Sequence, residues 1–300
     1  MDRFHLMSVF VAVAEEEGFA AAARRLRMSP PAVTRAISAL EEHLGIKLLN
    51  RTTRFVRTTE AGQRYLDDAR RILADVEAAD EAAVGINATP HGDLSITAPV
   101  LFGRRFVLPG VVEYLQRFPD TRVSAMFLDR VVNLLEEGVD VGIRIGDLPD
   151  SSLRARQVGS VRVVVVASPE YLATHGTPRT LEALREHTLL TVASGGGPQT
   201  WRFEHNGDAR PIRIRPRLTV TTNDAAVSAT ARGFGISRLL SYQAAPELAS
   251  GALQRLLEEY EPAPKPVHII HREGRVQSAK VRSFVDLMAE KLRADNRLNP

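Results

Sequence analysis

The spacing of apolar residues changes partway along this 300-residue chain, and this change constrains the fold more than any other feature. Up to about residue 83, apolar side chains recur every three or four positions, which is typical of helices with one buried face. Beyond the glycine-containing stretch 85–92, short apolar runs alternate with helical stretches. The change predicts two separately packed parts, for which 300 residues are long enough.

The first 58 residues predict helices followed by a hairpin. Ser29 suits a helix N-cap, Pro30 suits the first helical position, and Gly45 suits the helix end. Extended runs at 46–49 and 55–57 enclose a polar tip. This order of elements predicts a winged helix-turn-helix, in which the second helix of the pair enters the DNA major groove. The apolar face of that helix, with intervals of 4, 3 and 4, is Val33, Ile37, Leu40 and Leu44.

The charge distribution favours a polyanionic partner. Residues 18–58 hold eight basic and two acidic side chains, a charge of +6 in a chain that totals +3. The alternative is a solvated basic surface. Hydroxyls and one arginine opposite the apolar face suit base edges, and arginines at the hairpin tip suit phosphates or the minor groove. The predicted DNA-contacting residues are Ser29, Pro30, Pro31, Thr34, Arg35, Ser38, Arg51 and Arg54.

A long helix is predicted after Thr59, which suits its N-cap. Small and apolar residues repeat along it at intervals of 4, 3, 4, 3 and 4, the seam of a coiled coil. The spacing predicts self-association through this helix, and the alternative is that the stripe packs on its own chain. The predicted seam is Tyr65, Ala69, Ile72, Val76, Ala79 and Ala83.

The second part predicts a parallel, right-handed α/β sheet, because short strands alternate with helices. The strands expected first are 94–98, 123–128 and 139–145, with helices at 104–118 and 130–137 between them. A second block has strands at 162–167, 189–192 and 218–221, a helix at 225–232, a last strand at 267–271 and a last helix at 278–293.

Several motifs resemble those of one known family. The segments AAARRL (21–26), SPPAVTRAISALEEHLG (29–45), NRTTR (50–54) and TEAG (59–62), followed by APV (98–100), DVGIRIG (140–146) and GFGI (233–236), are similar to the LysR-type transcriptional regulators over nearly the whole chain. The resemblance implies an overall α/β protein with a DNA-binding domain at 1–58, a linker and dimerisation helix at 59–86 and an effector-binding domain at 91–300. It also implies dimers or tetramers, and two lobes similar to periplasmic binding proteins: lobe I at about 91–160 and 267–300, and lobe II at about 161–266.

Two lobes predict a ligand site where strands end and helices begin, because free backbone N–H groups there favour small anions or polar groups. Other interpretations stay open: Arg144 pairs with Asp140 or Asp129, Asn223 and Asp224 only cap a helix, and Ser194 belongs to a flexible glycine loop. Matched to the family pattern, the expected effector-binding residues are Ala98, Pro99, Val100, Phe102, Arg144, Ser194, Gly195, Thr222, Asn223 and Asp224.

The sequence gives no support to catalysis. There are no cysteines, and the dinucleotide, P-loop, zinc-protease and GxSxG motifs are missing, so we expect no catalytic residue, cofactor or metal. No apolar run reaches the length of a membrane span and no signal peptide is evident, which predicts a cytosolic protein without a membrane partner. The expected partners are double-stranded operator DNA, RNA polymerase, further copies of the chain and a small-molecule effector, in particular an organic anion.

Two rival functions remain at this point. A transport-type binding protein would share the α/β part, but the N-terminal unit and the missing signal peptide oppose it. An architectural DNA binder without a ligand would share the N-terminal part, and ligand-induced thermal shift would separate it from a sensor.

Overall fold

The computed structural model describes residues 2–51, 56–84, 89–148, 153–192, 199–272 and 278–298. The chain forms two compact units, Met1–Ala88 and Thr89–Pro300. Among the described helices, none combines the length and the apolar character needed to cross a membrane.

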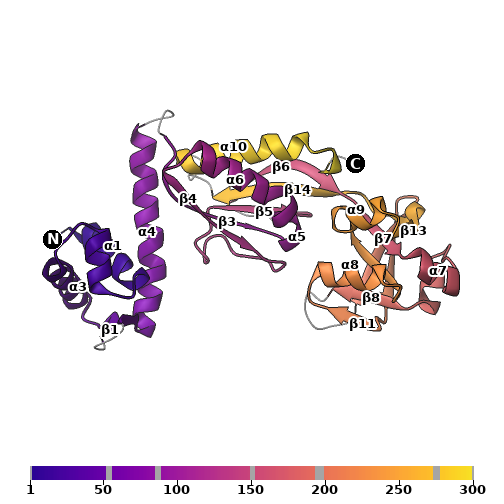
Figure 1. The fold of residues 1–300 in the computed structure, drawn as a ribbon, viewed down its shortest axis with the longest axis horizontal. Helices are drawn as coiled ribbons and strands as arrows, with labels where there is room; N and C mark the ends of the chain where they lie inside the picture. Colours follow the sequence, from indigo (N-terminus) through magenta and orange to yellow (C-terminus); the bar gives the residue numbers. More distant parts are fainter. Residues whose placement is uncertain are drawn as a thin grey trace. The chain divides into compact units, whose positions relative to one another are not determined.

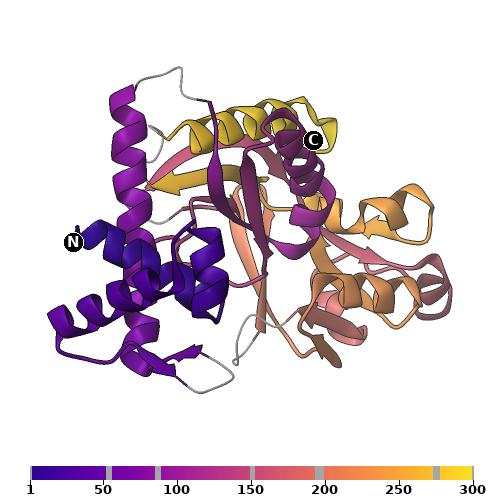
Figure 2. The same ribbon diagram turned by 60° about the vertical axis from the view of Figure 1, so that its left-hand side comes forward.

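The N-terminal unit contains the predicted helices and hairpin. The helices α1 to α3 lie along one side of the long helix α4 (Figures 1 and 2). The first strand begins at Leu49 and not at Ile46, because residues 46–48 connect α3 to the hairpin without strand pairing. The elements are α1 (Arg3–Glu15), α2 (Phe19–Arg25), α3 (Pro30–Leu44), β1 (Leu49–Arg51), β2 (Val56–Thr58) and α4 (Glu60–Val84).

Local sequence explains where α3 begins and ends. Ser29 is its N-cap, Pro30 occupies the first turn, and Gly45 ends it in the left-handed conformation at φ 68°. Glycine adopts this conformation without the steric cost that other residues have. The predicted apolar face packs into the core of the unit together with Phe10 of α1.

The start of α4 is fixed by a cap and by a close backbone approach. Thr59 Oγ1 accepts the N–H of Gly62 at 2.8 Å and donates to the carbonyl oxygen of Lys47 at 2.9 Å. A Cβ atom at Gly62 would lie 1.9 Å from the carbonyl oxygen of Leu48. Only glycine fits there, so α4 and the residue before β1 are packed backbone against backbone.

Lobe I of the C-terminal unit is a five-stranded sheet in the order β4-β3-β5-β14-β6. The strands β3, β4 and β5 are parallel, but β14 is antiparallel to both of its neighbours, so the prediction of an all-parallel sheet is wrong. The helices α6 and α10 lie side by side on this sheet (Figure 1). The elements are β3 (Gly92–Ala98), α5 (Val100–Phe102), a π-helical stretch (Gly103–Val107), α6 (Leu108–Arg117), β4 (Thr121–Phe127), β5 (Val141–Ile145), β6 (Leu153–Val161), β14 (Lys265–Arg272), α10 (Ala279–Ala294) and a 3₁₀ turn (Asn296–Leu298).

The helix predicted at 130–137 is also wrong, because this stretch forms turns and irregular structure. Asn133 Oδ1 accepts the N–H of Leu135 at 3.1 Å, and Arg130 pairs with Glu137 at 2.6 Å across the turn. Asparagine side chains that bond nearby backbone N–H groups offer the chain an alternative to the helix.

Lobe II is a second five-stranded sheet in the order β11-β8-β12-β7-β13, with an added hairpin of β9 and β10. The strand β12 is parallel to β8 and antiparallel to β7. The sequence analysis missed β9, β10, β12 and β13 here, and β6 in lobe I. The elements are β7 (Val163–Ala167), α7 (Pro169–His175), a 3₁₀ turn (Glu182–Glu186), β8 (Leu189–Val192), β9 (Gln199–His205), β10 (Asp208–Ile214), β11 (Leu218–Val220), α8 (Asn223–Ala231), β12 (Ile236–Leu240), α9 (Ser241–Ala249), β13 (Gln254–Leu256) and a 3₁₀ turn (Glu258–Tyr260).

Two segments cross between the lobes, one at Arg162 and the other after Tyr260. The N–H of Arg162 donates to Ser241 Oγ at 3.2 Å, and the N–H of Ser241 donates to the carbonyl of Arg162 at 2.8 Å. Glu261 accepts from Arg255 at 2.7 Å and lies 3.8 Å from Arg162. The bonds to Ser241 join the first crossing segment to the start of α9, and the Glu261 pair joins the two crossing segments to each other.

Candidate DNA-binding surface and inter-lobe pocket

One face of α3 is exposed, and it carries every residue that the sequence predicted on this helix as a DNA contact. On the opposite face Val33, Ile37 and Leu40 are 0% exposed. The buried face therefore fixes which side of the helix is presented outward. The exposed residues are Ser29, Pro30, Pro31, Thr34, Arg35 and Ser38.

The polar side chains of this face differ in the hydrogen bonds that they already make within the helix. Thr34 Oγ1 donates to the carbonyl oxygen of Pro30 at 3.1 Å, so its oxygen remains as an acceptor. Ser29 makes no side-chain cap bond. In the hairpin, Arg51 is the last residue of β1, whereas Arg54 lies outside the described residues.

Glu41 has a structural role that sequence reasoning missed. Its side chain is buried in α3, where Oε1 accepts the N–H groups of Leu48 at 2.9 Å and Leu49 at 3.2 Å, and Oε2 accepts from Lys47 Nζ at 2.7 Å. Burial raises the pKa of this carboxyl, but the three donors outweigh burial and hold the pKa below its ordinary 4.5. Glu41 thus fastens the exposed helix to the first strand of the hairpin.

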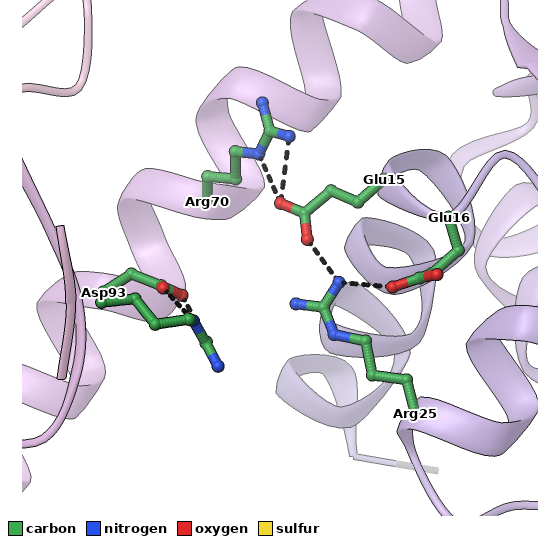
Figure 3. A network of polar contacts seen from close by, with 6 residues as sticks. Glu15, Glu16, Arg25, Arg70 and Asp93 are labelled. Atoms are coloured by element: carbon green, nitrogen blue, oxygen red, sulfur yellow. Dashed lines mark hydrogen bonds and ion pairs between the residues drawn. The ribbon is translucent and has the colours of Figure 1, made fainter. Parts of the chain in front are cut away.

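A network of exposed charges connects α1, α2 and α4 (Figure 3). Glu15 accepts from Arg70 of α4 at 3.0 Å and from Arg25 of α2 at 2.7 Å. Arg25 also lies 3.4 Å from Glu16. The network links the long helix α4 to α1 and α2.

The predicted seam of α4 divides into two parts. Tyr65 packs edge to face on Phe10 of α1, with ring centroids 5.5 Å apart, and Ala69 is 0% exposed. For these two residues the alternative interpretation, packing on the same chain, is confirmed. Ile72 and Val76 are half-buried and Ala79 is exposed, while the side chain of Ala83 lies outside the described part.

In the C-terminal unit, one carboxylate brings together two of the predicted effector-binding segments. Asp129, just after β4, accepts the N–H of Val100 through Oδ1 at 3.0 Å. Its Oδ2 accepts the side-chain amide of Asn223 at 3.2 Å. Val100 begins the helical run 100–117 of lobe I and Asn223 begins α8 of lobe II, so this contact spans the two lobes.

The other predicted effector-binding residues lie in different surroundings. Ala98 and Phe102 are 0% exposed in the core of lobe I, and Pro99 is half-buried. Asp224 interacts with the Thr222 hydroxyl, which lowers the pKa of the Asp224 carboxyl. Ser194 and Gly195 lie outside the described residues.

The side chain of Arg144 hydrogen-bonds to main-chain carbonyl groups. Its guanidinium donates to the carbonyl oxygens of Ile143 and Val132, each at 3.1 Å, and not to the carboxylates of Asp140 or Asp129. Burial lowers the pKa of this guanidinium. The contacts give Arg144 a structural role in holding the 130–137 turn to β5.

A pocket of about 310 Å³ lies between the lobes, beside the Asp129 contact. It carries three arginines and two carboxylates, and its Glu247 Oε2 atom is buried without a hydrogen-bond partner in the described part of the chain. The lining residues are Leu101, Arg104, Arg105, Asp224, Val227, Ser228, Ala231, Arg232, Gln243 and Glu247.

Arg105 and Tyr242 join the lobes next to the crossing segments. Arg105 Nη1 donates to the carbonyl oxygens of Tyr242 and Gln243, and the Tyr242 ring packs against Phe102 with centroids 5.4 Å apart. Burial raises the pKa of the Tyr242 hydroxyl to about 12. Asp129, Arg104 and Arg105 were missed as candidate residues, although Asp129 follows β4 as Pro99 follows β3.

Within the described ranges, no three His, Asp or Glu side chains are grouped as a metal site would require.

Two family models match the chain. One, described as LysR substrate binding domain, matches residues 87–293, and the other, described as bacterial regulatory helix-turn-helix protein of the lysR family, matches residues 4–63.

Individual proteins are similar over nearly the whole length. The HTH-type transcriptional regulator CrgA of Neisseria meningitidis serogroup B is 34% identical over 287 residues, which cover 95% of this chain and 96% of that protein. DmlR of Escherichia coli K12, also an HTH-type transcriptional regulator, is 33% identical over 285 residues, 95% of this chain and 92% of that one. The solved structure of CrgA gives a TM-score of 0.62 over 96% of this chain and 98% of that chain at 34% identity. The Vibrio cholerae virulence activator AphB gives 0.62 over 96% and 99% at 27% identity.

Proposed function

This chain belongs to the LysR family of DNA-binding transcriptional regulators, and from that premise we propose that the exposed face of α3 reads an operator while the two lobes hold a small organic anion. Regulators of this family bind DNA and small-molecule effectors, act as oligomers and are not enzymes. The observation that carries the proposal is the exposed set on α3 opposite a face on which Val33, Ile37 and Leu40 are fully buried.

The chemistry of this face suits base edges. Arg35 lies between Thr34 and Ser38, and arginine binds guanine through two hydrogen bonds in the major groove. Thr34 offers its oxygen as an acceptor. Arg51 and Arg54 of the hairpin are proposed as backbone or minor-groove contacts.

The test compares operator and random DNA. Arg35→Ala is expected to weaken binding to an operator selected from a random pool by about 1 to 3 kcal/mol and to change random-DNA binding far less. Arg51→Ala and Arg54→Ala should weaken both equally and lower the salt slope by about one per lost contact. Arg27→Ala, an exposed arginine outside the proposed face, is the control. If Arg35→Ala lowers the affinity for operator and random DNA equally, Arg35 contacts phosphate and not bases.

Self-association is proposed along α4. Ile72, Val76 and Ala79 continue the stripe beyond the part that packs on its own chain, and Ala83 extends it in sequence. A charge placed in a coiled-coil seam is costly, so Ile72→Asp should weaken dimerisation and operator binding together. Sedimentation of a folded, fully dimeric variant would refute the seam.

The anionic effector is proposed from charge and helix geometry. Arg104, Arg105 and Arg232 line the inter-lobe pocket, and two helical runs begin beside it, at Val100 and Asn223. Backbone N–H groups at helix starts favour anions. Calorimetry with benzoate and succinate tests this, and Val100→Trp should abolish the effect of the anion on DNA binding while operator affinity stays unchanged. A protein that binds neither anion and shows no thermal shift would fit an architectural DNA binder instead.

The functional divisions that we propose are 1–58 for reading DNA, 59–86 for dimerisation and 91–300 for sensing. The relatives of this chain regulate transcription in bacteria, and we propose that this protein likewise acts in the cytoplasm and contacts RNA polymerase. Binding of purified polymerase to operator DNA, measured with and without the chain, tests that partner.

A further inference from the structure

A single carboxylate bridges the two lobes. Asp129 accepts a backbone N–H from Val100 in lobe I and a side-chain N–H from Asn223 in lobe II, at 3.0 and 3.2 Å. Asp129 is exposed and Asn223 is half-buried, so water and solutes reach the bridge. Water or a solute can therefore replace either partner of this exposed hydrogen bond at little cost in free energy.

The lobes are also joined covalently, by the two crossing segments at Arg162 and after Tyr260. There, Arg162 and Ser241 exchange two backbone-anchored hydrogen bonds, and Arg105 holds the carbonyl of the neighbouring Tyr242. These buried and half-buried contacts fit a hinge. A rotation about this hinge would separate Asp129 from Asn223, because the two residues belong to different lobes.

The donors that Asp129 occupies are those that an anionic effector would seek. The N–H of Val100 belongs to the first turn of a helical run, and Asn223 begins α8 beside the pocket with its three arginines. A carboxylate from the protein already satisfies both donors. A ligand carboxylate must therefore displace Asp129 or leave those donors unused.

We propose that Asp129 is an internal competitor of the effector: without ligand its carboxylate holds the lobes in this arrangement through Val100 and Asn223, and an effector carboxylate displaces it from these two donors. Asp129 then helps to decide which anions bind, because only those that outcompete it are accepted. The competition rests on the proposed effector site, whereas the bridge itself does not.

A purely local role is the alternative, in which Asp129 only caps the helical run of lobe I. Asn223→Ala separates the two roles, because it removes the inter-lobe bond and leaves the bond to Val100. Glu290→Ala, a change at an exposed acid of α10 outside the pocket lining, is the control.

The distance between the lobes tests the bridge without any ligand. The chain has no cysteine, so spin labels can be placed on Gln116→Cys of α6 and Arg185→Cys of lobe II, both exposed, in the full chain diluted with unlabelled protein. We expect one narrow distance distribution for the otherwise unchanged chain and for Glu290→Ala, and a clearly broader or shifted one for Asn223→Ala and Asp129→Ala. An unchanged distribution for Asn223→Ala overturns the bridge.

Titration with benzoate and succinate tests the competition. If the bridged state holds about 90% of the molecules, its removal raises the apparent affinity about tenfold, so Asp129→Ala should bind one of these anions about tenfold more tightly. Weaker binding by Asp129→Ala would overturn the competitor role and make Asp129 a ligand contact. If no variant binds either anion, the anionic effector and with it the competition fail, while the distance measurement still decides the bridge.

Discussion

The N-terminal unit and lobe I differ in how far apart in sequence their packing partners lie. In the N-terminal unit β1 pairs with β2 across a short tip, and α1 packs on α2, α3 and α4, all within the first 84 residues. In lobe I the strand β14 enters the middle of the sheet after the whole of lobe II has intervened. Local order therefore specifies the DNA-reading unit, whereas long-range order specifies the sensing unit.

The largest expected effect uses one glycine in each unit. A Cβ atom at Gly62 would lie 1.9 Å from the Leu48 carbonyl oxygen, and one at Gly235 would lie 2.3 Å from that of Thr188. Gly62→Ala should destabilise the N-terminal unit by roughly 3 kcal/mol or more and abolish DNA binding. Gly235→Ala should destabilise lobe II by a similar amount and abolish effector binding.

The readout separates the two units, because the single tryptophan, Trp201, is buried in lobe II. Trp201 fluorescence should report an unchanged unfolding midpoint for Gly62→Ala and a lowered one for Gly235→Ala. Gly18→Ala, where the nearest contact is an ordinary 3.5 Å, is the control. Loss of both functions in each variant would show that the units are not independent.

The next effect concerns Glu41, which ties α3 to the hairpin. Glu41→Ala leaves two buried N–H groups without a partner and should cost about 2 to 3 kcal/mol, seen as weaker operator binding and a lower helix melting midpoint by circular dichroism. Because the pKa of the folded state is lowered, the contribution is present above pH 4.5 and is lost as the pH falls through the folded-state pKa. The exposed Glu42→Ala should leave both measurements unchanged.

A smaller effect is expected on the pH dependence of the stability of lobe II. Burial lowers the pKa of His187, which hydrogen-bonds Tyr171 at 3.1 Å, below the ordinary 6.5. As the pH falls below 6.5 the unfolded state takes up this proton first, so the stability of lobe II should fall by less than about 1 kcal/mol until the folded-state pKa is reached. The midpoint from Trp201 fluorescence should show this fall, and His187→Gln should remove it. A fall of equal size in His187→Gln would assign the effect to another group.

The smallest effect is expected from the exposed network on α4. Arg70→Ala should change stability by less than about 1 kcal/mol, because exposed ion pairs are screened by water and salt. A double-mutant cycle with Glu15→Ala measures the pair, and high salt should reduce the coupling. A coupling that exceeds this range and persists in high salt would contradict a surface role.

The sequence predicted the elements of the N-terminal unit because each carries a local signal: Ser29 and Gly45 bound α3, and Thr59 caps α4. In the C-terminal unit the two lobes were predicted from the family resemblance, but the antiparallel β14 and β12 were not. Strand direction depends on partners that are distant in sequence, and no local residue encodes it. The partners of Glu41 and Asp129 lie six or more residues away, so no local pattern revealed their roles either.

The most direct test of the central claim, that the exposed face of α3 enters the major groove, is site-directed DNA cleavage. Ser38→Cys gives this cysteine-free chain one attachment point for an iron chelate on that face. We predict cuts in two groups about 10 base pairs or a multiple apart, at positions in the major groove of the operator. The same chelate on Asp120→Cys, an exposed residue of the C-terminal unit, should give none of these cuts. Cuts from Ser38→Cys that scatter like those of free chelate would contradict the account.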